Sequence, residues 1–138
     1  MTLLECLQTF LMGDATLAAK LPGGLRPQII PQGSNFPMAT VKMISASGEQ
    51  GTHDGGASPW VRMRLELTVW GTDFKTQEQT LLYMMGKFEP FNGYLGGSTN
   101  GRFAVTGLNG PRSIQDEATK LVGVQLDVLG MLNRSTLS

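Results

Sequence analysis

The chain has 138 residues, 41% of them hydrophobic, which suits one domain with its own core and excludes a disordered chain. Its 11 basic and 11 acidic residues cancel, whereas proteins that bind nucleic acid through the phosphates usually have a basic excess, so we expect no tight DNA or RNA binding. The single cysteine, Cys6, excludes an internal disulfide. No signal-peptide pattern and no apolar run of about 18 residues is present, so we expect a soluble protein made in the cytoplasm, without membrane contact.

The first third of the chain predicts a helical start followed by extended segments. Thr2 and Glu5 have the spacing of a capping box, and apolar residues at helical spacing follow to residue 11. Asp14 is placed to cap a second short helix that ends near residue 21. Three prolines within residues 25–37 predict an extended edge or loop segment, since proline cannot donate to a strand ladder. A strand is expected over residues 38–47.

The middle of the chain predicts a loop, a strand and a helix. Residues 48–59 contain no large apolar side chain, which indicates a long connection of a kind that is often functional. Residues 61–69 alternate apolar and polar side chains, as in a strand with one buried face. Asp73 is placed to cap a helix to residue 88, with an expected core stripe of Phe74, Leu81, Leu82, Met85 and Phe88.

The last third predicts two strands. A glycine-rich turn over residues 92–101 leads to a strand over 102–108, which Asn109-Gly110-Pro111 is expected to break, and a polar turn follows over 113–117. The final strand is expected over 119–129. The order of elements predicts an α+β fold, a mainly antiparallel sheet with helices packed on one face. We expect a single domain over residues 1–132 and a flexible C-terminal tail over 133–138.

Groups with catalytic potential are few. His53 is the only histidine and lies beside Asp54 in the glycine-rich segment, where a fixed catalytic geometry is hard to hold. Cys6 falls on the apolar face of the first helix, which favours a buried, inert thiol. Gly86-Lys87 lacks the remainder of a phosphate-binding loop. We therefore predict no catalytic residues, no cofactor, no metal site and no enzymatic activity.

Two large aromatic residues, Trp60 and Trp70, flank the alternating strand on its polar face. Exposed aromatic side chains are typical of protein interfaces, but ordinary packing at the strand ends explains them equally well. Met84 and Met131 are further candidates for an interface.

Several segments together resemble one family. They are Arg26-Pro27 to Pro31-Gln32-Gly33 with Pro37, the strand ending Leu67-Thr68-Val69-Trp70 before Gly71-Thr72-Asp73, the polar turn 113–117, and the last strand, 121–129. In order and spacing they resemble the tail completion, or tail terminator, proteins of long-tailed bacteriophages. The resemblance covers residues 3–130.

This resemblance implies a structural virion protein that forms a hexameric ring on the head-proximal end of the tail tube. Such a ring ends tube polymerisation and joins the tail to the head connector. The implied partners are further copies of the chain, the tail tube protein and a head-side neck or connector protein. The implied location is the head–tail junction of the virion, assembled in the host cytoplasm. DNA passes through such a ring without tight binding, and no catalytic residues are implied.

From the residues themselves, we expect the long connection to reach a neighbouring ring. We expect the subunit contacts to involve the edge strand after Pro37 and the polar face of the alternating strand. The candidate interface residues are Glu49, Gln50, Thr52, His53, Asp54, Trp60, Arg62, Arg64 and Glu66. Two alternatives stay open: another ring-forming neck, connector or tail tube protein, and a small monomeric ligand-binding module. Self-assembly distinguishes them, because a terminator stops at a closed ring, a tube subunit polymerises, and a binding module stays monomeric.

Overall fold

The computed structural model describes residues 1–27, 35–50, 57–118 and 120–137, without the side chains of 45–50 and 57–58. Within this part the chain forms three α-helices, six strands and a short 3-10 helix. The helices are α1 (Leu3–Met12), α2 (Ala15–Lys20) and α3 (Phe74–Phe88). The strands are β1 (Leu25–Pro27), β2 (Met38–Gln50), β3 (Ala57–Gly71), β4 (Asn92–Tyr94), β5 (Arg102–Asp116) and β6 (Leu121–Asn133). The 3-10 helix η1 is Arg134–Thr136.

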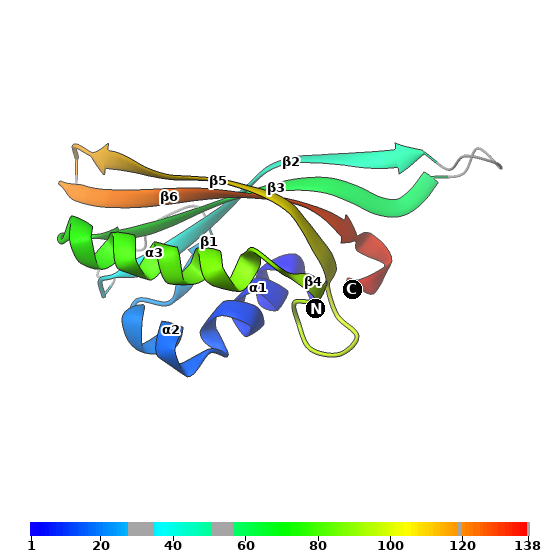
Figure 1. The fold of residues 1–138 in the computed structure, drawn as a ribbon, viewed down its shortest axis with the longest axis horizontal. Helices are drawn as coiled ribbons and strands as arrows, with labels where there is room; N and C mark the ends of the chain where they lie inside the picture. The colour runs from blue at the N-terminus through cyan, green and yellow to red at the C-terminus, as the bar shows by residue number, and fades with distance from the viewer. Residues whose placement is uncertain (28–34, 51–56, 119, 138) are drawn as a thin grey trace.

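The strands form one sheet in the order β1-β2-β3-β6-β5-β4. The pair β1–β2 is parallel, and the other four pairs are antiparallel. All three helices lie on the same side of the sheet, and the other side carries no helix (Figure 1). The predicted α+β class, with a mainly antiparallel sheet and helices on one face, is confirmed.

Side-chain caps start the helices where the sequence predicts. The Thr2 hydroxyl accepts a hydrogen bond from the Glu5 backbone N–H and the Glu5 carboxylate accepts one from the Thr2 N–H, which completes a capping box for α1. The carboxylates of Asp14 and Asp73 cap α2 and α3 by accepting hydrogen bonds from backbone N–H groups of the first turn. The three predicted caps are confirmed.

The core lies between the sheet and the helices. Val61, Met63, Leu65, Leu67 and Val69 alternate along β3 and are all buried, as predicted. They meet the apolar residues of β6 on one side and the buried face of α1, including Cys6 and Leu7, across the layer. Full burial of one such aliphatic side chain stabilises the fold by about 1.5–3 kcal/mol.

The core stripe predicted for α3 is wrong at two positions. Phe74 and Leu82 are 44% and 47% exposed, while Gln77 and Met84 are fully buried. The helix is rotated towards a face that includes a polar residue, because the Gln77 side-chain amide donates hydrogen bonds to the Val69 and Val122 carbonyls. Met84 is therefore a core residue, not an interface residue.

The connection predicted over residues 48–59 is shorter than expected. Strand β2 continues to Gln50 and β3 begins at Ala57, with Gln50 opposite Ala57 in the ladder. Ladder hydrogen bonds come from the backbone, so this hairpin extends through a segment without large apolar side chains.

The break predicted after residue 108 is also wrong. Strand β5 continues to Asp116 through two irregularities, between Val105 and Gly107 and between Asn109 and Arg112. Pro111 lies in the second of these, where a residue without an N–H is tolerated. The predicted turn 113–117 is thus mostly strand, and β6 runs from Leu121 to Asn133, beyond its predicted end at 129.

The segment predicted to be a tail, residues 133–138, begins with η1. The Thr136 hydroxyl accepts a hydrogen bond from the Arg102 backbone N–H at 2.8 Å, and the Thr136 carbonyl accepts one from the Gly101 N–H at 3.3 Å. The start of the segment is therefore joined to β5, while its flexibility stays a prediction.

Candidate functional site

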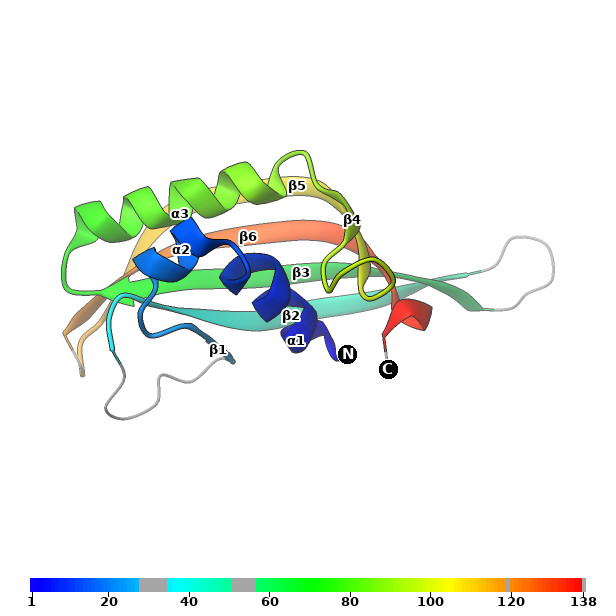
Figure 2. The ribbon, with the colours of Figure 1, turned by 90° about the horizontal axis from the view of Figure 1, so that it is seen from below.

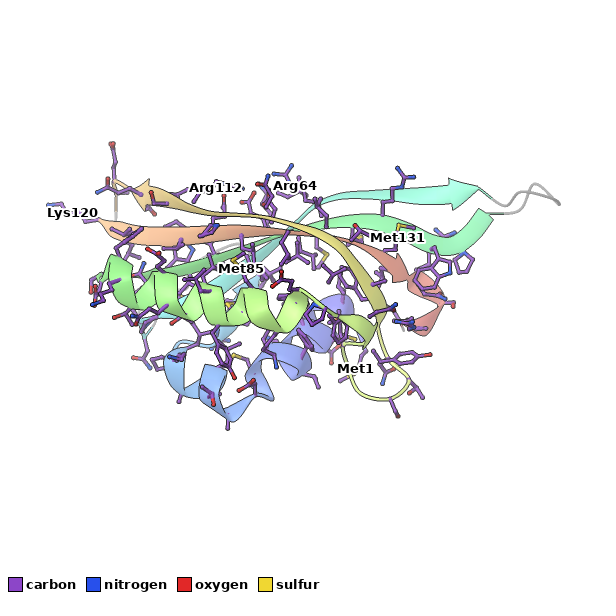
Figure 3. All side chains as sticks on the ribbon, viewed as in Figure 1. Met1, Arg64, Met85, Arg112, Lys120 and Met131 are labelled. Atoms are coloured by element: carbon purple, nitrogen blue, oxygen red, sulfur yellow. The ribbon has the colours of Figure 1, made fainter. Side chains whose placement is uncertain are left out.

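The candidate site is the face of the sheet without helices, which we call the open face (Figures 1 and 3). It is formed by alternate residues of β2, β3, β6 and β5, because successive side chains of a strand point to opposite sides. Its described side chains include Thr40, Lys42, Trp60, Arg62, Arg64, Glu66, Thr68, Trp70, Arg112, Gln125, Asp127, Leu129 and Met131.

At the centre of the open face, one carboxylate is held by two arginines. Asp127 is only 2% exposed, although no helix covers it. Its Oδ2 accepts a hydrogen bond from Arg64 Nη2 at 2.8 Å, and its Oδ1 accepts one from Arg112 Nη2 at 3.0 Å. Bonds of this kind are charge-assisted and stronger than neutral ones. The arginine side chains thus take the place of a covering layer.

Gln125 extends this cluster across three strands. Its Oε1 accepts a hydrogen bond from Arg112 Nε at 2.9 Å, and its Nε2 donates to Glu66 Oε1 at 2.7 Å and to Thr68 Oγ1 at 3.1 Å. The polar cluster of β3, β6 and β5 therefore satisfies its buried amide, as a buried polar network must do to stabilise a fold.

The same arginines remain available to a partner. The side chains of Arg64 and Arg112 are 39% exposed, so solvent screens their ion pairs, which we expect to contribute only about 1 kcal/mol each. Figure 3 shows Arg64 and Arg112 on the side of the sheet away from the helices. The open face also carries Lys42 and Arg62. Its four described cations outnumber the carboxylates Glu66, Asp116 and Asp127, so its described part has a basic excess.

Four of the predicted interface residues can be placed on this face. Trp60, Arg62, Arg64 and Glu66 follow one another along β3 on its open side, with Glu66 and Trp60 half-buried. The structure brings Arg64 and Glu66 into the polar cluster. Their role in an interface stays a prediction.

The other predicted interface residues are not part of a described site. Glu49 and Gln50 belong to β2, but their side chains lie outside the described part of the chain. Thr52, His53 and Asp54 lie outside the described residues altogether.

Sequence reasoning missed Arg112, Gln125 and Asp127 as members of this cluster. The signal for the latter two was available, because a carboxylate and an amide that alternate with apolar residues in a central strand need buried partners. The signal for Arg112 was not, since it follows Pro111 in a segment whose composition favours a turn.

A second polar cluster lies on the helix side. Asp14 accepts hydrogen bonds from the Tyr83 hydroxyl at 2.9 Å and from Lys87 Nζ at 3.1 Å, which ties α2 to α3. These bonds, the Tyr83 one foremost, lower the pKa of Asp14 to about 2. Lys87 Nζ also lies 4.8 Å from the centroid of the Phe10 ring. Each of these interactions therefore joins α3 to another helix or its cap.

The described residues were also searched for reactive groups, metal ligands and membrane-spanning helices. Cys6 is fully buried, and burial raises the pKa of its thiol, which disfavours the nucleophilic thiolate. In the part of the chain that the structure describes, no three His, Cys, Asp or Glu residues are grouped so as to hold a metal ion. None of the helices there has the length and apolar character needed to cross a membrane.

Comparison with known proteins yields a structural match. No protein-family model matches the chain, and no curated protein sequence matches it. Among solved structures, the chain is similar to a chain of the virion of a native gene transfer agent particle. The TM-score is 0.65 at 15% sequence identity, and the match covers 95% of this chain and 94% of the other. The two chains therefore share one fold over nearly their whole length.

Proposed function

We propose that this protein is a structural subunit of a phage-type virion that forms a closed ring on the head-proximal end of the tail tube. There it ends tube polymerisation and joins the tail to the head-side connector. The observation that carries the proposal is the shared fold, over 95% of the chain, with a chain of a gene transfer agent virion, which is a phage-like particle. The sequence resemblance to tail terminator proteins supplies the position within the tail.

The surface of the subunit is consistent with this role. A ring subunit must bind a neighbour on each side. The chain has an open sheet face with an excess of cations, and its exposed apolar residues on the strands include Met43, Ile44 and Leu129. The role requires no catalysis, and we propose that the protein is not an enzyme.

Electron microscopy of the purified protein, together with light scattering after size-exclusion chromatography, tests the proposal. We expect closed rings of one size, formed alone or on isolated tail tubes, and we expect rings added to growing tubes to stop elongation. Open-ended tubes would instead indicate a tail tube subunit. A protein that stays monomeric both alone and with tail tubes would contradict the proposal.

A further inference from the structure

We propose that neighbouring subunits pair edge to edge, with β2 of one copy beside β5 of the next, so that the sheets join around the ring. This inference rests on the proposed function, because it assumes that the assembly is a ring. It assigns the subunit contact to two strand edges and a groove that lie outside the polar cluster.

Among the described residues, both edges of the sheet have a stretch of backbone without a partner strand. On one edge, β1 pairs with β2 only over Ala39–Val41, so no described strand covers the outer side of β2 from Lys42 onward. On the other edge, β4 pairs with β5 only up to Ala104, and the Phe91 carbonyl accepts a hydrogen bond from the Val105 N–H. From Thr106 onward the outer side of β5 has no partner among the described strands. Unpaired edges of this kind are templates for another strand.

The two uncovered stretches lie at the same height in the sheet. The ladder aligns Met43 with Leu65, Leu65 with Val128, and Val128 with Leu108. Met43 on one edge and Leu108 on the other therefore belong to one row. Figure 2 shows β2 and β5 on opposite long edges of the sheet, with β1 and β4 beside only part of each.

This arrangement suits a ring geometrically. The pairs β2–β3, β3–β6 and β6–β5 are all antiparallel, so β2 and β5 run in opposite directions. A rotation about an axis along the strands moves no residue up or down, so it brings Leu108 of one copy beside Met43 of the next in antiparallel orientation. The contact joins two different edges, and such head-to-tail contacts form a ring when the rotation between neighbours closes on itself.

The side chains at this height are complementary. On β2, Met43 is 46% exposed and Ile44 is 36% exposed. Met43 has the same alternation as the buried Val41, so it points to the helix side of the sheet. On the opposite edge and the same side, a hollow of about 370 Å³ lies between α3 and β5, lined by Met85, Glu89, Val105, Thr106, Gly107 and Leu108. Met85 lies on α3 (Figure 3). An exposed apolar side chain on one edge is thus matched on the other edge by a hollow whose lining includes the apolar residues Met85, Val105 and Leu108.

The backbone favours the same contact. The Ala39 N–H donates to the Gly24 carbonyl on the β1 side, so by alternation the N–H and carbonyl of Met43 also point outward.

Paired cysteines test this contact in the full-length protein. We expect the double variant Met43→Cys with Leu108→Cys to give, on mild oxidation, a ladder of disulfide-linked oligomers that ends at the ring. Each single variant should give none, because the contact joins different edges. A second pair, Ile44→Cys with Gly107→Cys, guards against misfolding of the first, since a Cβ at Gly107 meets only Leu129 Cδ1 at 3.7 Å. The native Cys6 is buried and should not react.

The control is Met43→Cys with Leu82→Cys, because Leu82 is exposed on α3 and does not line the hollow. We expect no ladder from it. Rings without a ladder from either test pair would overturn the inference and leave the proposed function standing. Linked dimers from Met43→Cys alone would also overturn it, because they would indicate a two-fold contact. A failure to assemble alone and on tail tubes would contradict both.

Discussion

At the residue scale, Asp127 shows how a sheet without a second layer can bury a carboxylate. Both of its oxygens accept hydrogen bonds from guanidinium groups, and these long side chains exclude solvent while their own outer atoms stay wet. The result is a surface that is polar to a partner but ordered before the partner arrives.

We expect Asp127→Asn to destabilise the fold by about 1–3 kcal/mol, because an amide group would place N–H donors against one of the arginines and leave it without its acceptor. Urea denaturation followed by tryptophan fluorescence measures the change. The matched control is Glu117→Gln, an exposed carboxylate near the β5–β6 turn, which we expect to shift the midpoint little. Equal midpoints for the two variants would contradict the importance of the cluster.

Asp14 provides a pH test. Its pKa in the folded protein, about 2, lies below the ordinary value of 3.8, so its charged form stabilises the fold. This contribution is complete above the pKa of the unfolded chain and is lost as the pH falls through the folded pKa. We therefore expect Asp14→Asn, which keeps an N-cap oxygen, to be less stable than the wild type at pH 6, and the difference to shrink from about pH 4 to pH 2. A difference that stays constant over that range would show that the charge of Asp14 is not the cause.

At the element scale, the features that depend on local sequence patterns were predicted correctly. The caps at Thr2, Asp14 and Asp73, and the alternation along β3, depend on residues close in sequence, and the structure confirms them. The rotation of α3 could not be predicted in this way, because it depends on the Gln77 amide reaching two carbonyls in different strands. The length of β5 likewise depends on its pairing with β6.

The open face illustrates the same limit. Alternation placed Arg62, Arg64 and Glu66 on one side of a strand, and this is where they lie. The partner of Arg64, however, is Asp127 in another strand, a contact between residues far apart in the sequence. A single sequence carries no local signal for such a register.

Two glycines give a matched test of element packing. A Cβ at Gly130 in β6 would lie 2.5 Å from Phe103 Cζ and 2.6 Å from the Ala104 carbonyl oxygen, whereas a Cβ at Gly86 in α3 would have nothing within 4 Å. We expect Gly130→Ala to destabilise the fold by about 1–3 kcal/mol through overpacking. Gly86→Ala should stabilise it by about 0.5–1 kcal/mol, because alanine favours the helix. Thermal unfolding measures both, and a stable Gly130→Ala variant would show that β6 and β5 can move apart.

At the scale of the whole molecule, the sheet is longer than the helix layer that covers it. The β2–β3 hairpin extends past the helices at one end, and the β5–β6 connection lies at the other (Figure 1). The side chains at the two ends also differ. The carboxylates Asp116 and Glu117 lie at the β5–β6 end, and the aromatic residue Trp60 lies near the hairpin end of β3.

In the proposed ring, this difference between the ends would give the assembly a direction. Rotational symmetry makes every subunit point the same way, so all hairpins would stand on one rim and all β5–β6 connections on the other. The two rims would then be distinct docking sites, and a partner that fits one would be rejected by the other. A single polypeptide could in this way present one rim to a tail and the opposite rim to a head, and the order of assembly would follow from the shape of the subunit.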